Sequence, residues 1–339
     1  MNRILVVRVG ALGDTVMVTP TLRALRRHHP QAEIDFLCSE SAGALLERNP
    51  QITRIIRLRR RNLPYAISFE KQQLTRALRA RCYDMAVLLE SAPRYRDLLT
   101  RARIPEIRSF AEFPFDPHQH CIVNYLRVAG AHDLKAAALD MDMHLSEVET
   151  AAAQRLLHDL PRPRVGIQVG YGPRRGKKNQ SQRLRGWNPE HVVRLIHDLL
   201  RRQVSIVLTG SAEDRAETQH LVQDLPHGRV RSLAGQTSIR ELAAVVGSLD
   251  VFLSVDTGAA HIAAALGIPL AVLWGPAIYE QTRPVSTSSP IRIMRVSVPC
   301  APCYGTPLMK SCARNICMEG ISPGVALKVV EDLLNRKRS

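Results

Sequence analysis

A turn near the amino terminus combines two glycines with a carboxylate. The run Gly10-Ala11-Leu12-Gly13-Asp14-Thr15 follows a β-rich stretch over residues 3–9. Glycine lets the backbone turn sharply and approach a ligand closely, and an aspartate at the carboxyl end of a strand can act as a general base. The structural alternative is that Asp14 caps the next helix. The turn lacks the third glycine of the dinucleotide-binding fingerprint, so it does not indicate that cofactor.

A second candidate site is Ser254-Val255-Asp256-Thr257-Gly258-Ala259-Ala260-His261, which has the pattern of a strand, a turn and a helix. Thr257 and Gly258 would lie at the helix N-terminus, where backbone N–H groups and the helix dipole favour a pyrophosphate. We expect Asp256 to hold the loop by accepting backbone N–H bonds. His261, one turn into the helix, faces either the core or a ligand.

Two more segments carry charged residues just after expected strands. A basic segment leads into Arg185-Gly186-Trp187-Asn188-Pro189, and its cations are Arg174, Arg175, Lys177, Lys178, Arg183 and Arg185. Such cations can neutralise a departing diphosphate without a metal. We expect Trp187 to anchor the loop by packing and Asn188-Pro189 to start a helix. Glu213, just beyond a strand ending at Thr209, suits a ribose hydroxyl or complements a helix dipole.

Four of the seven cysteines are clustered late in the chain. Cys300, Cys303, Cys312 and Cys317 follow the spacing C-x2-C-x8-C-x4-C, which is compatible with a four-thiolate zinc or iron site. Such a metal would be structural, because four protein ligands leave no open position. The alternative is reduced thiols in a folded loop.

The elements that must position these residues form two successive α/β series. Strands are expected over residues 3–9, 33–38, 52–58 and 84–89, and again over 164–170, 204–209, 250–255 and 269–274, with helices between them. This alternation predicts two Rossmann-like, doubly wound parallel sheets facing a cleft, with ligands at the carboxyl ends of the strands. Pro161-Arg162-Pro163 suggests domains over residues 1–160 and 161–322. A final helix lies within 323–339, with packing on the first domain left open. Pro20 should interrupt a helix over residues 15–28.

Composition and charge limit the partners. The chain has 339 residues, a net charge of +16 and 4% aromatic residues. The basic excess suits nucleic acid, anionic lipid or a phosphorylated substrate. The scarcity of aromatics argues against base stacking, so no nucleic acid is expected. Residues 51–110 hold 14 Lys and Arg against five acids.

The sequence also bears on the cellular compartment. The amino terminus shows no secretory signal, and the longest apolar stretch, residues 259–274, is broken by glycine and proline before it reaches membrane-spanning length. We therefore expect a cytoplasmic protein with reduced cysteines, whose membrane contact is peripheral.

The motifs together resemble glycosyltransferase family 9, the heptosyltransferases of lipopolysaccharide core assembly. The resemblance extends over nearly the whole chain. Its four motifs are Arg8-x-x-x-Leu12-Gly13-Asp14-Thr15-Val16-x-x-Thr19-Pro20, Leu233-Ala234-Gly235-Gln236-Thr237-Ser238, Ser254-Val255-Asp256-Thr257-Gly258-x-x-His261, and Leu273-Trp274-Gly275-Pro276.

This resemblance implies a GT-B fold and an inverting transfer that needs no cofactor. The implied donor is a nucleotide-sugar, typically ADP-L-glycero-D-manno-heptose, and the implied acceptor is a lipopolysaccharide core or related glycolipid. Asp14 would deprotonate the acceptor hydroxyl, with Gly10, Gly13 and Thr15 in the same turn. Donor contacts would come from Arg185, Glu213, Asp256, Thr257, Gly258 and His261.

One departure from the family leaves a choice open. Members present Lys-x-Trp-Pro where this chain has a longer basic insertion before Arg185-Gly186-Trp187-Asn188-Pro189. Arg185 occupies the place of the lysine, but Lys177, Lys178 or Arg183 could make the phosphate contact instead.

The resemblance also bears on the partners and on the kind of acceptor. A lipid-linked saccharide acceptor would bring the protein to the anionic cytoplasmic leaflet of the inner membrane, which the basic excess suits. Other members of the family have paired cysteines before the last helix, and relatives that modify proteins are similar to forms that bear zinc or iron. The resemblance therefore leaves open a protein (autotransporter-type) heptosyltransferase. A non-catalytic nucleotide-sugar or nucleic-acid binding protein and a nucleotide-sugar epimerase of similar fold stay open as well.

Overall fold

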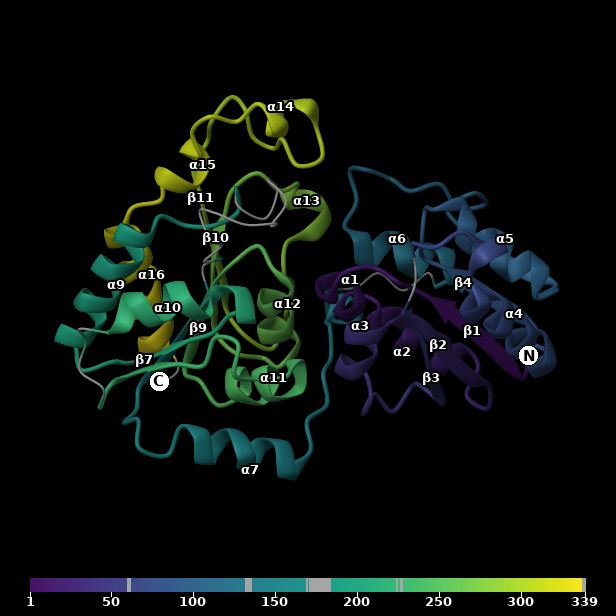
Figure 1. Cartoon of the computed structure of the whole chain (residues 1–339), viewed down its shortest axis with the longest axis horizontal. Coiled ribbons are helices and arrows are strands. Elements are labelled where there is room, and N and C mark those ends of the chain that lie inside the picture. Colours follow the sequence, from purple (N-terminus) through teal and green to yellow (C-terminus); the bar gives the residue numbers. More distant parts are fainter. Residues whose placement is uncertain are drawn as a thin grey trace. The chain divides into compact units, whose positions relative to one another are not determined.

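The chain forms two compact α/β units, Met1–His144 and Leu145–Ser339 (Figure 1). The computed structural model describes residues 1–59, 62–131, 136–168, 170, 184–223, 225 and 228–336. The second unit begins before the Pro161-Arg162-Pro163 segment because helix α7 (Glu147–Leu156) packs on α11 (Ile239–Gly247). Each unit contains one parallel sheet with helices connecting its strands, as the alternation of elements predicted.

The first sheet has the strand order β3-β2-β1-β4-β5 and is parallel throughout. Its strands are β1 (Arg3–Val7), β2 (Glu33–Ser39), β3 (Arg54–Leu58), β4 (Met85–Leu88) and β5 (Glu106–Ser109). The helices of this unit are α1 (Leu12–Val16), α2 (Thr19–His28), α3 (Glu40–Leu45), α4 (Phe69–Arg81), α5 (Pro93–Arg101) and α6 (Cys121–Val128). The central strands are apolar and buried, as expected for a sheet covered on both faces.

The helix predicted over residues 15–28 is interrupted shortly before Pro20, as the proline predicted. Two helices, α1 and α2, replace it, and Pro20 lies in the first turn of α2. A proline is tolerated there because first-turn N–H groups have no partner within the helix. The break leaves α1 as a short helix of its own, which carries Asp14.

The second sheet has the order β11-β10-β9-β6-β7-β8 and is also parallel. Its strands are β6 (Arg164–Gln168), β7 (Ser205–Leu208), β8 (Val230–Ser232), β9 (Val251–Val255), β10 (Leu270–Trp274) and β11 (Ile291–Arg295). The main helices around it are α9 (Pro189–Arg201), α10 (Arg215–Val222), α11, α12 (Gly258–Ala265) and α16 (Pro323–Arg336).

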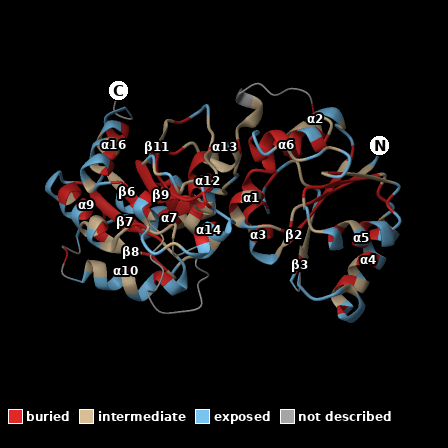
Figure 2. Cartoon of the chain, turned by 90° about the horizontal axis from the view of Figure 1, so that it is seen from above, coloured by how far each residue is buried: buried red, intermediate tan, exposed pale blue. Residues whose placement is uncertain are grey.

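The C-terminal helix α16 belongs to the second unit. It contacts α9 and strands β9, β10 and β11, and its buried side chains Ala326, Val330 and Leu333 join the core of that sheet. Figure 2 shows buried residues along the strands and on the inward helix faces. Helix α16 thus packs on the second sheet, and its packing on the first domain, which the sequence left open, stays a prediction.

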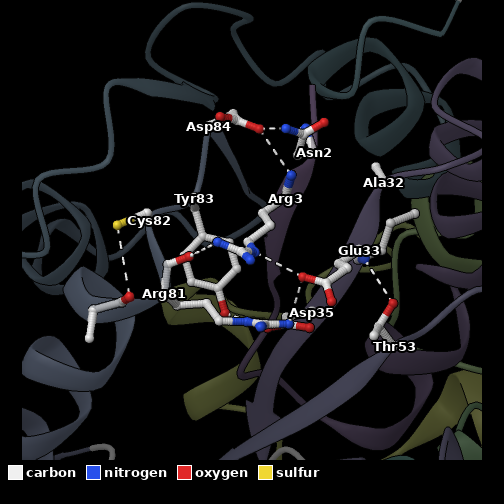
Figure 3. Close-up of polar contacts among 12 residues, drawn as sticks. Asn2, Arg3, Ala32, Glu33, Asp35, Thr53, Arg81, Cys82, Tyr83 and Asp84 are labelled. Carbon is white, nitrogen blue, oxygen red and sulfur yellow. Dashed lines mark hydrogen bonds and ion pairs between the residues drawn. The ribbon is translucent and has the colours of Figure 1, made fainter.

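A polar network fixes the amino edge of the first sheet (Figure 3). Asp35, fully buried on β2, accepts hydrogen bonds from the Tyr83 hydroxyl at 2.6 Å and from Arg81 Nε at 3.2 Å. Burial raises the pKa of Tyr83, and the Asp35 carboxylate raises it further, so the phenol remains a donor. This edge carries structural polar groups, and the opposite, carboxyl edge is left for the candidate site.

Within the described residues, no helix is both long enough and apolar enough to cross a lipid bilayer.

Candidate active site

Asp14 lies just beyond the carboxyl end of β1, as the third residue of α1. Its Oδ2 lies 2.8 Å from Arg8 Nη2 and accepts a hydrogen bond from the backbone N–H of Ala11 at 3.2 Å. Ala11 is the N-cap residue of α1, and the Asp14 carboxylate accepts its backbone N–H from within the first turn of the helix. Both contacts use one carboxylate oxygen, and the side chain is 27% exposed. Neither contact uses the other carboxylate oxygen, Oδ1.

Arg8 is held in a cage of acceptors around Asp14. Its Nη1 donates to the carbonyl of Leu89 at 2.8 Å and lies 3.4 Å from Glu90 Oε1, and its Cζ lies 5.6 Å from the centre of the Tyr125 ring. Burial disfavours the charged guanidinium, but Tyr125, Asp14 and Glu90 outweigh burial and raise the pKa of Arg8 above its usual value. Arg8 is thus a permanent cation that orients Asp14.

Sequence reasoning missed Glu90 and Tyr125 as members of this cage. Glu90 directly follows the predicted strand over residues 84–89, so an acid at a strand end was the available signal. Its Oε1 also accepts from the backbone N–H of Val9 at 2.6 Å, which closes the turn. Tyr125 lies on α6, and its position gave no signal in the sequence.

Gly10 is required by the closeness of the Arg8–Asp14 pair. A Cβ atom on Gly10 would lie 2.8 Å from Asp14 Oδ2 and 3.1 Å from Arg8 Cζ, so a side chain would displace the ion pair. Gly13 and Thr15 are buried within α1, and Thr15 Oγ1 donates to the carbonyl of Ala11 at 3.2 Å. These two residues shape the turn.

The predicted anion site is the junction of β9 and α12. Thr257 is the N-cap residue, but its side chain makes no capping bond; its hydroxyl lies 3.2 Å from Ser254 Oγ. Gly258 begins the helix, as expected. His261 is 3% exposed. The first-turn N–H groups are therefore not capped by Thr257, and an anion can take that place.

Arg185 is brought to this junction. Its Nη1 donates to the Asp256 carbonyl at 3.0 Å and lies 3.4 Å from Asp256 Oδ2. Its Cζ lies 5.4 Å from the centre of the Tyr304 ring. The Asp256 carboxylate meets this guanidinium because the loop before α9 places Arg185 at the end of β9, and the backbone N–H bonds expected for Asp256 stay a prediction. Tyr304 was not predicted.

The remaining cations of the basic segment, Arg174, Arg175, Lys177, Lys178 and Arg183, lie outside the described residues. The loop after them is anchored as predicted. Trp187 is 4% exposed, and its Nε1 donates to the Ile321 carbonyl at 3.0 Å. Asn188 caps α9 by accepting from the backbone N–H of Glu190 at 2.9 Å, with Pro189 as the first helical residue.

Glu213 and Asp214, the two acids after β7, differ in burial and in their contacts. Asp214 is buried and accepts from the backbone N–H and the hydroxyl of Ser211 at 2.8 and 2.7 Å. Glu213, its neighbour in the same turn, is exposed. The capping task therefore belongs to Asp214. Gly235, at φ +67°, lies against this turn. A Cβ atom at that position would lie only 2.7 Å from Ala212 Cα, so glycine is required there.

The late cysteines lie in a segment bound to the loop after β10. The backbone N–H groups of Cys303 and Tyr304 donate to the Pro276 carbonyl at 3.0 and 2.9 Å. Burial raises the pKa of Cys317 to about 11, and the thiols of Cys300, Cys303 and Cys312 add to it. All four of these cysteines are free of disulfides. Among the residues that the structure describes, no three His, Cys, Asp or Glu side chains are grouped to hold a metal ion.

Two parallel sheets with connecting helices, one in each unit, are the architecture of the GT-B class of glycosyltransferases. The sequence profile of glycosyltransferase family 9 (heptosyltransferase) matches residues 72–312, and the chain belongs to that family.

Individual relatives agree with this assignment. Lipopolysaccharide heptosyltransferase 2 of Escherichia coli K12 is 26% identical over 316 residues, which cover 87% of this chain and 88% of that protein. The solved structure of E. coli ADP-heptose lps heptosyltransferase II covers 100% of both chains at 23% identity, with a TM-score of 0.79. The glycosyl transferase family 9 structure from Veillonella parvula gives a TM-score of 0.83 at 20% identity and covers 99% of this chain and 98% of that one.

Proposed function

We propose that the protein transfers heptose from ADP-L-glycero-D-manno-heptose, with inversion, to a lipopolysaccharide core or a related glycolipid. The observation that carries the proposal is a pair of features in one family 9 chain. Asp14 follows β1 with one carboxylate oxygen not hydrogen-bonded to any described residue, and Thr257-Gly258 follow β9 at a helix N-terminus that Thr257 does not cap. The name of the E. coli K12 relative supports the choice of lipopolysaccharide as acceptor.

In the proposed reaction, Asp14 takes the proton from the acceptor hydroxyl as its oxygen attacks the anomeric carbon. The bond between that carbon and the diphosphate oxygen breaks, and ADP leaves with the electron pair. The first-turn N–H groups of α12, the Thr257 hydroxyl and the Arg185 guanidinium take up the developing charge. Attack from the face opposite the diphosphate inverts the anomeric centre.

The other predicted donor residues have supporting roles in this proposal. Exposed Glu213 accepts hydrogen bonds from the ribose hydroxyls, since Asp214 already caps the turn. Asp256 holds Arg185 in place. His261 is buried in α12, and its role in this proposal is to hold that helix, with its first-turn N–H groups, in place.

We also propose that the first unit rests on the anionic cytoplasmic leaflet. Ile67 and Phe69 are 70% and 67% exposed, and Leu63 is 36% exposed in the same short segment. The guanidinium of Arg101 lies 4.7 Å from the centre of the Tyr65 ring in this segment. Apolar side chains beside cations suit the boundary between lipid headgroups and acyl chains. This location brings the enzyme to a lipid-linked acceptor.

A structural zinc or iron ion at Cys300, Cys303, Cys312 and Cys317 stays a prediction from their spacing, and the protein-acceptor alternative stays with it. The reaction above needs no metal. Elemental analysis of protein purified without an affinity-tag metal checks the cysteines: about one equivalent would support a metal site, and none would leave four reduced thiols.

A thermal-shift panel of ADP-, UDP- and GDP-sugars tests the proposed donor. ADP-heptose at about 100 times its Kd should stabilise the fold by about 2.7 kcal/mol, while UDP- and GDP-sugars should leave the melting temperature unchanged. Stabilisation by a UDP- or GDP-sugar instead would overturn the proposed donor. Stabilisation only by nucleic acid, falling steeply with salt, would favour a non-catalytic binding protein.

A further inference from the structure

The segment that carries the late cysteines also contacts the loop that carries Arg185. The Tyr304 ring lies 5.4 Å from Arg185 Cζ. Further along the segment, Asn315 Nδ2 donates to the Gly186 carbonyl at 3.3 Å. Gly186 directly follows Arg185, so this hydrogen bond holds the backbone from which the guanidinium extends.

Asn315 lies at a helix position where asparagine usually has another task. It is the N-cap residue of the short helix α15 (Ile316–Glu319). An N-cap asparagine usually accepts a backbone N–H of its own helix through its side chain. Helix α15, which the structure describes in full, receives no such bond from Asn315. The amide is directed to the Arg185 loop instead.

Cys317 sets the direction in which this amide faces. Its Sγ donates to Asn315 Oδ1 at 3.3 Å. The Gly186 carbonyl can only accept, so the amide nitrogen must face it, and the amide oxygen is left for the thiol. Cys317 is 7% exposed and belongs to the core of the second unit. The amide is therefore satisfied at both ends and held in one orientation by a buried neighbour.

The hold on the backbone matters because Arg185 itself is tied through one nitrogen. Its Nη1 meets the Asp256 carbonyl at 3.0 Å and Asp256 Oδ2 at 3.4 Å, while its Nε is buried with no hydrogen-bond partner among the described residues. A guanidinium paired at one nitrogen can pivot about it. Its direction therefore depends on the backbone at Gly186, and a preorganised direction decides how well a cation meets a developing charge.

We infer that Asn315 is a positioning residue for Arg185: its amide, oriented by Cys317, holds Gly186 and thereby the direction of the guanidinium. The inference rests on the proposed function, in which Arg185 meets the charge on the departing diphosphate. Asn315 touches neither substrate and acts through the loop. The cysteine segment thus contributes a hydrogen bond to the arrangement of the proposed site.

A double-variant cycle on turnover tests the inference. Asn315→Asp keeps the size of the side chain and the oxygen that faces Cys317 but removes the donor to Gly186, and Asn315→Ala removes the donor without adding a charge. We expect kcat to fall about 3- to 10-fold in both, as for the loss of one hydrogen bond. Either change should cause no further fall in the Arg185→Ala background. Asn335→Asp, at an exposed asparagine on α16, is the matched control and should leave kcat unchanged.

Trypsin gives a second readout, which does not depend on the reaction. The bond between Arg185 and Gly186 is a trypsin site, and its cleavage requires the loop to open locally. In both Asn315 variants this bond should be cut about 3- to 10-fold faster. Mass spectrometry of the fragment that begins at Gly186 measures the rate, and Asn335→Asp should be cut at the wild-type rate.

The outcomes separate the two proposals. Faster cleavage, together with a loss of kcat that vanishes in the Arg185→Ala background, supports both. A wild-type cleavage rate, an unchanged kcat, or a kcat loss of equal size in both backgrounds overturns the positioning role of Asn315 and leaves the proposed function standing. If the wild-type protein transfers no heptose from ADP-heptose, the proposed function is wrong, and the cleavage rate alone decides whether Asn315 holds Arg185.

Discussion

Arg8 Nη2 lies 2.8 Å from Asp14 Oδ2, six residues further along the same strand and turn. The pair is surrounded by Glu90, Tyr125 and the Leu89 carbonyl, so Arg8 has little freedom to leave it. The proposed base is therefore oriented by a neighbour that keeps its charge at any working pH. A base held in this way presents the same oxygen to each acceptor.

Replacing Asp14 by asparagine should lower turnover by about two to four orders of magnitude, because the amide cannot take the proton. Binding of the nucleotide-sugar should persist, since the proposed donor contacts all come from the second unit. Steady-state kinetics and titration of the donor check the two halves. Asp97→Asn, an exposed aspartate on α5, is the control. Unchanged turnover in the Asp14 variant would end its assignment as base.

Replacing Arg185 by alanine should lower kcat by about 10²- to 10³-fold, as for loss of one donor to a developing oxyanion. Product inhibition by ADP should weaken in parallel, because the same guanidinium would meet the leaving diphosphate. Arg185→Lys should recover part of both. Arg194→Ala, on the exposed side of α9, is the matched loss of a cation. A fully active Arg185→Ala protein would direct the search to Lys177, Lys178 and Arg183.

The double variant Ile67→Glu, Phe69→Glu should lose binding to vesicles that contain phosphatidylglycerol. Both side chains are more than two-thirds exposed, so the fold should tolerate the change. Loss of two apolar contacts and added negative charge should weaken binding by at least about tenfold. Co-sedimentation measures it, and Val148→Glu, at a side chain 74% exposed in the second unit, is the control. Wild-type vesicle binding by the double variant would rule out this segment as the contact.

The free energy of unfolding of the second unit should fall as the pH drops from about 4.5 to about 2. Arg240 donates to both carboxylate oxygens of Glu149 at 2.7 Å, and this pairing lowers the pKa of Glu149 to about 2. The folded pKa lies below the unfolded value of about 4.3, so the contribution is complete above the unfolded pKa and disappears as pH falls through the folded one. We expect a loss of about 1–2 kcal/mol.

Tryptophan fluorescence can follow this loss in urea, because both tryptophans, Trp187 and Trp274, belong to the second unit. Glu149→Gln should give a flatter pH dependence over the same interval. An equal slope in that variant would assign the acid sensitivity to other carboxylates.

Much of the fold follows from local patterns in the sequence. Buried parallel strands are continuous apolar runs, so the stretches leading to Gly10 and Asp256 were identifiable, and Pro20 marked a helix break. The edge strand β11 was missed because its sequence, Ile-Arg-Ile-Met-Arg, mixes apolar and basic residues. A half-buried edge strand carries a weaker signal than a central one.

The site was predictable only where its residues are consecutive. Asp14 and Thr257-Gly258 lie in turns whose chemistry can be read from neighbouring residues. Glu90 and Tyr125 meet Arg8 from other elements, and Tyr304 meets Arg185 from more than a hundred residues away. Such contacts depend on the strand order, which one sequence does not specify.

The Glu90 carboxylate links the end of β4 to the segment between β1 and α1, because it meets both the Val9 N–H and the Arg8 guanidinium. Loss of this carboxylate would free the neighbour that orients Asp14 without touching Asp14 itself. We therefore expect sequence changes at residue 90 to act on the proposed base from a distance, so that a chain can lose turnover while every residue from Gly10 to Thr15 stays the same.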